Sequence, residues 1–268
     1  RDIFSSVGIT IGGPNPWDII VHDARFYSRV LSDGSLGLGE SYMDGWWDCE
    51  RLDAFVAKIL QNGIEDKIRK NWPAILDALF SRLINRQSRS RAFEVGRAHY
   101  DIGNDLYQAM LDKRMVYTCG YWANAATLDE AQDAKLDLVC RKIGLKAGDR
   151  VLDIGCGWGS FAKFAAEKYG VRVVGVTVSQ EQAKLARERC AGLPVEVRLQ
   201  DYREVNESFD HVISLGMFEH VGYKNYRTYM EVARRCLKDD GLFLLHTIGG
   251  NRSVTGFEPW LGKYIFPN

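Results

Sequence analysis

The chain has 268 residues, 46% of them hydrophobic, and a formal net charge of zero from 35 basic and 35 acidic side chains. This length is enough to bury a sizeable core, and it favours one large domain or a main domain with a smaller companion. The balanced charge creates no overall field that would attract nucleic acid, so we expect no nucleic acid partner. Any electrostatic partner must be recognised by a local group of charges.

The cysteine positions argue against a disulfide framework and against a zinc site. The six cysteines form no CxxC pair, and the chain has no His-x-x-x-His motif. No apolar run approaches the roughly 18 to 20 residues that a membrane-spanning helix needs, and the first residues lack the pattern of a signal peptide. We therefore expect a reducing, cytoplasmic location and no bound metal.

The first part of the chain differs in composition from the rest. Residues 1–80 mix glycine, tryptophan and short apolar segments, and apolar residues from Leu52 to Leu60 recur at helical spacing. We expect a small, mainly helical domain here. Residues 81–97 contain five arginines and one acid, Glu94, which marks a candidate linker. Its arginines either form a solvated helix face or contact an anionic surface.

From residue 150 onward, strand and helix patterns alternate. Segments rich in valine, isoleucine and leucine are separated by amphipathic segments, and they lie at 150–155, 171–177, 194–200, 209–216 and 241–249. Continuous apolar strands between helices are typical of a parallel sheet that is covered on both faces. The sequence therefore predicts an α/β domain over residues 98–268 with a five-stranded sheet.

The segment "VLDIGCGWG" places Gly155, Gly157 and Gly159 directly after the first of these strands. Glycines at this point let the backbone approach a ligand at a helix N-terminus, and a tight turn without a ligand is the alternative. The spacing is GxGxG, whereas dinucleotide-binding proteins have GxGxxG. The second strand also ends in Thr177, without the acid that holds the ribose of NAD. The pattern favours S-adenosylmethionine over NAD.

Polar side chains at the strand ends are candidates for contacts with that cofactor. Asp153 closes the first strand and is a candidate for holding the amino-acid end of S-adenosylmethionine. Thr177 and Gln182 are candidates for the ribose hydroxyls, and Asp201 for the adenine amino group. Each residue also suits a helix cap or a turn. Their common position at the carboxyl ends of strands favours the binding interpretation.

The stretch "SLGMFEHVG" ends a strand near Leu215 and places Glu219 and His220 at the same edge of the sheet. In the alternative interpretation, Glu219 only stabilises the positive end of the following helix. The next strand ends in "LLHTIGG", which places His246 at the neighbouring strand end. Polar groups at two adjacent strand ends favour a site at this edge.

Upstream of the sheet, "HYDIGNDLYQAML" and "MVYTCGYW" gather several aromatic residues around Cys119. Aromatic clusters are more often core packing than a binding surface, and a lone cysteine is more often a small buried hydrophobic residue. These two segments become candidates for a site only in combination with the motifs that follow them.

The segments "HYDIGNDLY", "YTCGYW", "LDIGCGWG", "VGVTVSQEQ", "LQDYR", "MFEHVG" and "LLHTIG" occur in this order along the chain. With these separations, the chain resembles cyclopropane-fatty-acyl-phospholipid synthases and the related mycolic acid cyclopropane synthases over nearly its whole length. The leading "GSLGLGESYMDGWW" is similar to the N-terminal region of the bacterial phospholipid enzymes, which the mycolic acid enzymes lack. The resemblance implies a class I S-adenosylmethionine-dependent methyltransferase fold, which is Rossmann-like. It also implies formation of a cyclopropane ring at a cis double bond of an unsaturated phospholipid acyl chain.

The resemblance also implies which residues form the site. The contacts to S-adenosylmethionine would come from Tyr100, Tyr117, Thr118, Gly155, Gly157, Thr177, Gln182 and Asp201. A bound bicarbonate ion would act as general base, held by Cys119, Glu219, His246 and the backbone of Ile248. The family adds a tyrosine from a later segment, so we expect this catalytic domain to lack its C-terminal part.

These residue types suit the implied chemistry. Methyl transfer to an alkene leaves a carbocation, which aromatic faces stabilise without reacting. The charge of Glu219 would raise the proton affinity of bicarbonate beside it.

The expected partners are membrane phospholipids with unsaturated acyl chains and an anionic membrane surface, bound peripherally at the inner face. A homodimer is also allowed. The alternatives are a fatty acid methyltransferase with a branched methyl or methylene product, and an inactive lipid-binding protein on this fold.

Overall fold

The structure is a computed structural model that describes residues 2–62, 104–251 and 258–265, and these form two compact units. The smaller unit contains residues 2–62 together with 258–265, and the larger unit contains residues 104–251. The predicted basic linker, residues 81–97, lies outside the described residues.

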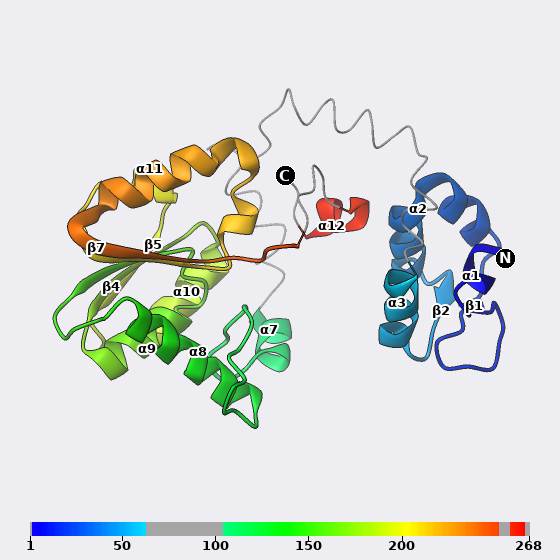
Figure 1. The fold of residues 1–268 in the computed structure, drawn as a ribbon, viewed down its shortest axis with the longest axis horizontal. Helices are drawn as coiled ribbons and strands as arrows, with labels where there is room; N and C mark the ends of the chain where they lie inside the picture. The colour runs from blue at the N-terminus through cyan, green and yellow to red at the C-terminus, as the bar shows by residue number, and fades with distance from the viewer. Residues whose placement is uncertain (1, 63–103, 252–257, 266–268) are drawn as a thin grey trace. The chain divides into compact units, whose positions relative to one another are not determined.

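The smaller unit is mainly helical, as the sequence predicts (Figure 1). Its elements are α1 (Asp2–Ser5), β1 (Ile20–Val21), α2 (Arg25–Met43), β2 (Trp47–Asp48), α3 (Leu52–Gln61) and α12 (Pro259–Tyr264). Phe4, Phe26, Trp47 and Phe55 are buried together in its core. The indole Nε1 of Trp47 donates a hydrogen bond to the carbonyl oxygen of Leu38 at 3.1 Å, so the polar atom of this buried ring is satisfied.

Helix α12 packs against α2 at a glycine. A Cβ atom on Gly39 would lie 2.3 Å from Cδ1 of Trp260, so the indole ring fits there only because residue 39 has no side chain. The sequence grouped residues 258–265 with the domain of residues 98–268, whereas the structure packs them in the smaller unit. The periodicity of residues 258–265 does not predict that they pack against α2, because the contact joins segments more than two hundred residues apart.

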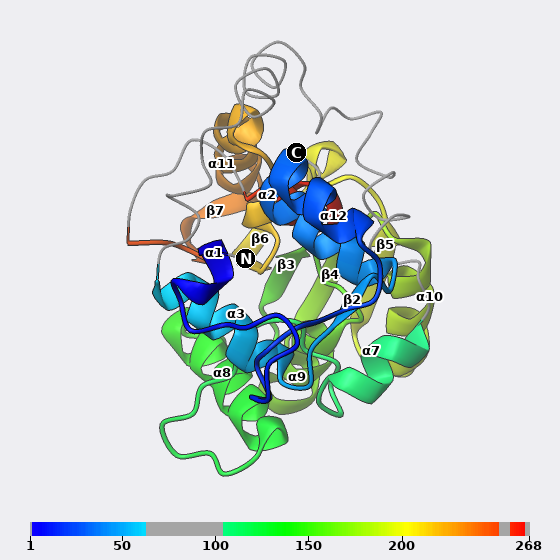
Figure 2. The same cartoon turned by 90° about the vertical axis from the view of Figure 1, so that its right-hand side faces the viewer.

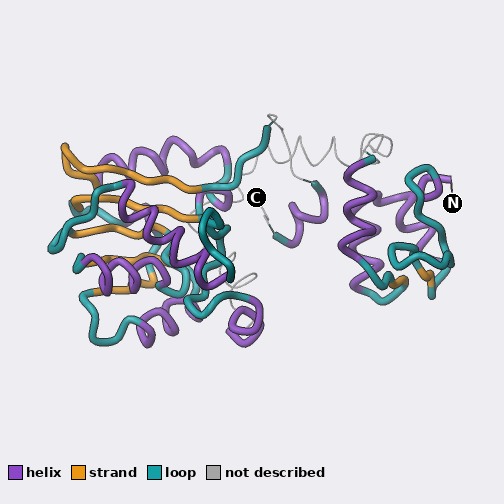
Figure 3. The backbone as a smooth tube through the Cα atoms, turned by 60° about the horizontal axis from the view of Figure 1, so that its bottom comes forward, coloured by secondary structure: helices purple, strands orange, loops and turns teal. Residues whose placement is uncertain are grey.

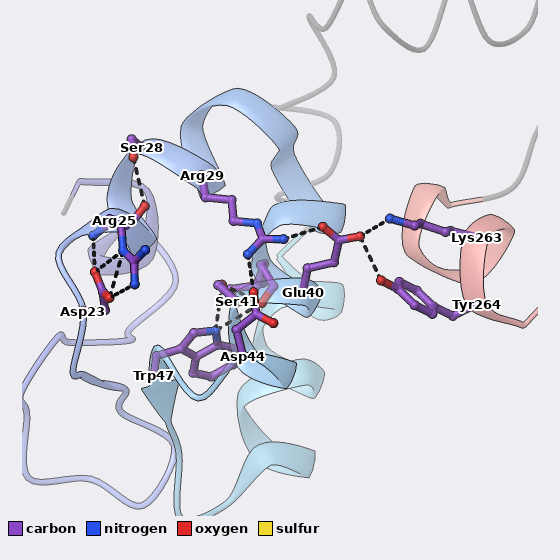
Figure 4. Close-up of polar contacts among 11 residues, drawn as sticks. Asp23, Arg25, Ser28, Arg29, Glu40, Ser41, Asp44, Trp47, Lys263 and Tyr264 are labelled. Atoms are coloured by element: carbon purple, nitrogen blue, oxygen red, sulfur yellow. Dashed lines mark hydrogen bonds and ion pairs between the residues drawn. The ribbon is translucent and has the colours of Figure 1, made fainter. Parts of the chain in front are cut away.

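A partly buried carboxylate adds a polar contact between these two helices (Figure 4). Glu40 on α2 pairs with the ammonium group of Lys263 and accepts a hydrogen bond from the hydroxyl of Tyr264 at 2.9 Å. It also accepts one from Arg29 at 2.7 Å. The hydrogen bond from Lys263 is the main cause that lowers the pKa of Glu40 to about 2, so the carboxylate stays charged.

The larger unit is an α/β domain. Its elements are α7 (Asn104–Met110), α8 (Leu128–Lys142), β3 (Arg150–Ile154), α9 (Ser160–Tyr169), β4 (Arg172–Thr177), α10 (Gln180–Arg189), β5 (Val195–Leu199), β6 (Phe209–Leu215), α11 (Tyr226–Cys236) and β7 (Leu237–His246). Short 3-10 helices span Tyr202–Glu204, Phe218–His220 and Tyr223–Asn225. The five strands are parallel in the order β5-β4-β3-β6-β7, which can be followed in Figure 2. The predicted five-stranded parallel sheet is confirmed.

Helices cover both faces of this sheet (Figure 3). Val151 of β3 faces α8 and α9 and belongs to a core cluster with Phe161. The next residue, Leu152, faces the opposite side and belongs to a cluster with Tyr229 of α11. Successive side chains of a strand point to opposite faces, so the continuous apolar runs in the sequence supply both cores.

The last strand differs from the prediction in its bounds. The sequence predicted a strand from residue 241, whereas β7 begins at Leu237, directly after α11. Leu237 pairs with Phe209, and a register shift between Phe209 and His211 accommodates the extra residues. Strand β7 therefore includes polar residues, between the paired Leu237 and Leu242, that an apolar pattern does not predict.

Within residues 2–62, 104–251 and 258–265, no helix combines the length and apolar composition that crossing a membrane requires.

We predict that Glu40→Gln loosens α12 from α2. The amide keeps the size of the side chain but removes the negative charge that pairs with Lys263, so amide hydrogens of α12 should exchange several-fold faster by hydrogen–deuterium exchange. Asp53→Asn, which removes a charge from an exposed pair with Arg51 in the same unit, is the matched control and should leave α12 unchanged. Equal exchange in Glu40→Gln and the wild type would show that Trp260 packing alone holds this helix.

Candidate active site

A pocket lies at the carboxyl ends of the central strands. The strand order reverses at β3, because β4 lies on one side of it and β6 on the other, and such a reversal leaves a crevice at the strand ends. Eight of the nine predicted cofactor-binding residues line this pocket: Tyr117, Thr118, Asp153, Gly155, Gly157, Thr177, Gln182 and Asp201. The ninth, Tyr100, lies outside the described residues.

The turn between β3 and α9 forms part of the pocket wall and requires glycine. Gly155, Gly157 and Gly159 have φ angles of 81°, 53° and 77°, in the left-handed region that other residues rarely adopt. A Cβ atom on Gly155 would also lie 2.5 Å from Cγ of Met217. The absence of side chains lets the backbone itself face the pocket.

Two oppositely charged side chains are buried at this pocket. Asp153 is 2% exposed, and its Oδ2 has no hydrogen-bond partner among the described residues. Lys135, from α8, is 5% exposed, and its Nζ donates to Oγ1 of Thr118 at 2.7 Å. Burial raises the pKa of Asp153 to about 7, an effect that Lys135 opposes, and burial lowers the pKa of Lys135 to about 8. The interior therefore disfavours the charged form of each group.

Sequence analysis missed Lys135, although its position offered an indication. The buried residues of α8 recur at helical spacing, and Lys135 stands among them: Ala131, Gln132, Lys135, Leu136, Val139 and Cys140. A lysine on the buried face of a helix is rare unless it meets a partner. The occurrence of this lysine within an apolar stripe could have identified it as a candidate site residue.

Thr177 and Gln182 lie together, as two residues that share a ligand would. The hydroxyl of Thr177 donates to Oε1 of Gln182 at 2.9 Å, and both side chains are buried. Asp201 instead accepts hydrogen bonds from the backbone N–H of Arg203 at 2.9 Å and from its guanidinium at 2.8 and 2.6 Å. It thereby caps the 3-10 helix that begins at Tyr202. The capping interpretation of Asp201 is correct, and a contact with adenine would have to share these oxygens with Arg203.

The four residues predicted to hold bicarbonate form two pairs near the ends of β6 and β7. The Sγ atom of Cys119 lies 3.5 Å from Nε2 of His246. The carboxylate of Glu219 accepts a hydrogen bond from the backbone N–H of Ile248 at 3.2 Å and one from the hydroxyl of Thr247 at 3.0 Å. The carboxylate of Glu219 therefore contacts the residues that follow β7. The alternative interpretation predicted that it would stabilise the start of a following helix.

His246 has the character of a ligand-binding imidazole. Its Nδ1 is buried and has no hydrogen-bond partner within the described part of the chain. Burial is the main cause that lowers the pKa of His246 below its usual value, and the charge of Lys135 adds to this effect. A buried nitrogen without a partner favours a polar ligand at this position.

Two aromatic residues upstream of the sheet, Tyr107 and Tyr117, pack with Trp158 from the turn after β3. The Tyr107 ring lies 4.6 Å from that of Trp158 and 5.4 Å from that of Tyr117, between ring centroids. Tyr107 and Trp158 are buried, whereas Tyr117 is 53% exposed. Core packing therefore explains Tyr107, whereas Tyr117 and Trp158 also line the pocket and can face a ligand.

We predict that Asp153→Asn increases the free energy of unfolding at about pH 8 and much less at about pH 4. The pKa of Asp153 in the folded protein, about 7, lies above its ordinary value of 3.8. Between these values the unfolded chain loses the proton that the folded chain retains, so stability falls as pH rises through this window. Asparagine avoids this loss, with a gain on the order of 2 kcal/mol.

Urea denaturation at both pH values measures this effect. Asp239→Asn is the control, because the side chain of Asp239 is 99% exposed and should show no such dependence. An Asp153→Asn variant whose stability parallels the wild type at both pH values would contradict the assigned pKa.

Comparison with known sequences places the chain in a family. The sequence model described as mycolic acid cyclopropane synthetase matches residues 87–268. The cyclopropane-fatty-acyl-phospholipid synthase of Escherichia coli strain K12 is 54% identical over 268 residues, which is 100% of this chain and 70% of that protein. A probable fatty acid methyltransferase of Pseudomonas putida is 43% identical, over 96% of this chain and 67% of that protein.

A solved structure agrees with this placement. The crystal structure of mycolic acid cyclopropane synthase CmaA1, complexed with SAH and CTAB, has 38% sequence identity and a TM-score of 0.55. The match covers 56% of this chain and 55% of that one. The predicted methyltransferase fold is therefore confirmed, and the chain belongs to the mycolic acid cyclopropane synthetase family.

Proposed function

We propose that this protein transfers a methylene group from S-adenosylmethionine to the cis double bond of an unsaturated phospholipid acyl chain, forming a cyclopropane ring. The observation that carries this proposal is the 54% identity, along the entire chain, with the E. coli cyclopropane-fatty-acyl-phospholipid synthase. The pocket supports it, because eight of the predicted cofactor-binding residues line one cavity. The similar CmaA1 structure holds SAH, the demethylated form of the proposed cofactor.

When bound, S-adenosylmethionine supplies the methyl carbon that becomes part of the ring. The residues of the pocket would hold the double bond in line with this carbon and exclude water, since an alkene is a weak nucleophile and water would trap the resulting carbocation. Tyr117 and Trp158 both line the pocket, with ring centroids 6.4 Å apart. Their faces suit stabilisation of a positive charge without reaction.

We also propose that bicarbonate, held near Cys119, Glu219 and His246, is the base that removes a proton from the added methyl group. The unpartnered Nδ1 of His246 supports a polar ligand there. Glu219 would accept a hydrogen bond from the hydroxyl of the ion and raise its proton affinity. The N–H of Ile248 donates to Glu219 in this structure, so its predicted contact with bicarbonate would require this bond to break.

The test is incubation of the protein with labelled S-adenosylmethionine and vesicles of unsaturated phospholipid, followed by NMR of the product. Ring protons in the labelled lipid are the expected result. A branched methyl or methylene group would replace this proposal with the second candidate, a fatty acid methyltransferase, which the P. putida relative favours by its name. Absence of label transfer together with absence of cofactor binding would indicate an inactive lipid-binding protein.

We predict that Glu219→Gln lowers turnover by about a hundredfold while leaving the affinity for S-adenosylhomocysteine nearly unchanged, because the charge on the proposed base site is lost. Glu231→Gln, on the outer surface of α11, is the control and should keep full turnover. The measurements are initial rates and calorimetric titration in bicarbonate-replete buffer. Wild-type turnover in Glu219→Gln would remove Glu219 from the proposed site.

We further propose that residues 1–80, joined by 258–265, form a lipid-associated domain, and that the catalytic domain begins near residue 98 and contains residues 104–251. We also propose that the protein docks peripherally on the anionic inner face of a membrane. Apolar side chains of the smaller unit are exposed, including Leu31 at 71% and Leu60 at 60%. Each basic residue near an anionic surface contributes about 1 kcal/mol, and this attraction decays over about 8 Å at physiological salt.

We predict that reversing Arg86, Arg89 and Arg91 to glutamate reduces co-sedimentation with anionic vesicles at low salt, because the segment of residues 81–97 would then be repelled. Neutral vesicles are the control and should bind both proteins equally. Unchanged co-sedimentation with anionic vesicles at low and high salt would assign these arginines to contacts within the chain.

A further inference from the structure

We infer that Lys135 binds the α-carboxylate of S-adenosylmethionine, opposite an α-ammonium group held by Asp153. This inference rests on the proposed function, because it assigns contacts to the cofactor of that reaction. Sequence analysis assigned Asp153 to the amino-acid end of the cofactor and assigned no residue to its carboxylate. The structure adds a cation of suitable charge in the same pocket.

The positions of the two side chains carry the inference. Lys135 and Asp153 both line the pocket at the end of β3, and they are 5% and 2% exposed. In the described part of the chain they do not pair with each other, since no ion pair within 4.0 Å joins them. Two opposite charges thus face one cavity from separate elements, α8 and β3.

Neither group has an ion-pair partner within 4.0 Å among the described residues, although each feels the charge of the other. The ammonium group of Lys135 donates a hydrogen bond to the neutral hydroxyl of Thr118, at 2.7 Å. The Oδ2 atom of Asp153 is buried and has no partner among the described residues. Buried charges are unfavourable unless they are paired and hydrogen-bonded, so a ligand with a negative and a positive group would relieve both costs.

The chemistry of the ligand follows from this pair of charges. An α-amino acid carries a carboxylate and an ammonium group on one carbon, and S-adenosylmethionine ends in such a group. A phosphate-bearing cofactor would satisfy Lys135 but would place negative charge beside Asp153. The pocket therefore selects a zwitterionic end over a phosphate.

A purely structural role for Lys135 explains less. Thr118 is already tied to α8 by a second bond, because Nε2 of Gln132 donates to the carbonyl oxygen of Thr118 at 2.7 Å. A neutral residue at position 135 would serve the remaining contact without the cost of a buried ammonium group. A charged ligand therefore explains the presence of a lysine at position 135 better than the contact with Thr118 does.

The test compares S-adenosylmethionine with ligands that lack part or all of its amino-acid end, by calorimetric titration of the full chain. Wild type should bind decarboxylated S-adenosylmethionine about 10- to 100-fold more weakly than S-adenosylmethionine, because the charged hydrogen bond to the carboxylate is lost. Lys135→Met should bind S-adenosylmethionine more weakly by a similar factor and should no longer distinguish the two ligands. Methylthioadenosine, which lacks both charged groups, should bind wild type and Lys135→Met equally.

Lys142→Met is the matched control, because Lys142 lies on the same helix with an exposed side chain. It should distinguish the two ligands as the wild type does. If Lys135→Met still distinguishes them, or if it binds all three ligands equally less well, the lysine acts only through structure and the inference is wrong.

The ligand comparison on the wild type needs no variant, so it decides the question even if Lys135→Met does not fold. Equal affinity of the wild type for S-adenosylmethionine and its decarboxylated form overturns the inference and leaves the proposed function standing. Failure of the wild type to bind S-adenosylmethionine at all overturns the proposed function itself.

Discussion

The left-handed turn after β3 is the constraint on which both parts of the site depend. Gly155 has a φ of 81°, and a side chain there would collide with Met217. Met217 directly precedes the 3-10 helix that carries Glu219. A substitution at this glycine would therefore disturb the backbone that faces the cofactor pocket and, through Met217, the segment at the end of β6. The close approach of the two strand ends requires glycine for both reasons.

Helix α8 connects the pocket to the cysteine–histidine pair. Gln132 and Lys135, one turn apart, hold the backbone carbonyl and the hydroxyl of Thr118. The next residue, Cys119, lies beside His246 at the end of β7. The segment around Thr118 is thus fixed on one side by a rigid helix and meets the sheet edge on the other. This arrangement places a candidate cofactor contact and a candidate bicarbonate contact on adjacent residues.

The pocket keeps charge in the interior at a cost to stability. Asp153 and Lys135 are both buried, and burial shifts the pKa of each toward its neutral form. Neither forms an ion pair with the other among the described residues. Unpaired buried charges are uncommon in structural cores and are typical of sites that bind charged ligands. The smaller unit differs in this respect, because its partly buried carboxylate, Glu40, is paired with Arg29, Lys263 and Tyr264.

The sequence by itself determined the parallel sheet, the glycine turn and the residues at the strand ends. Each of these leaves a local pattern, since strand burial repeats along the chain and a left-handed turn requires glycine. Only the tertiary structure decided that Lys135 faces the pocket, that Asp201 is engaged by Arg203, and that Glu40 pairs with Lys263, 223 residues away. These facts depend on which polar groups meet after folding, and the periodicity of a segment records the face that is buried but not the partner that it meets.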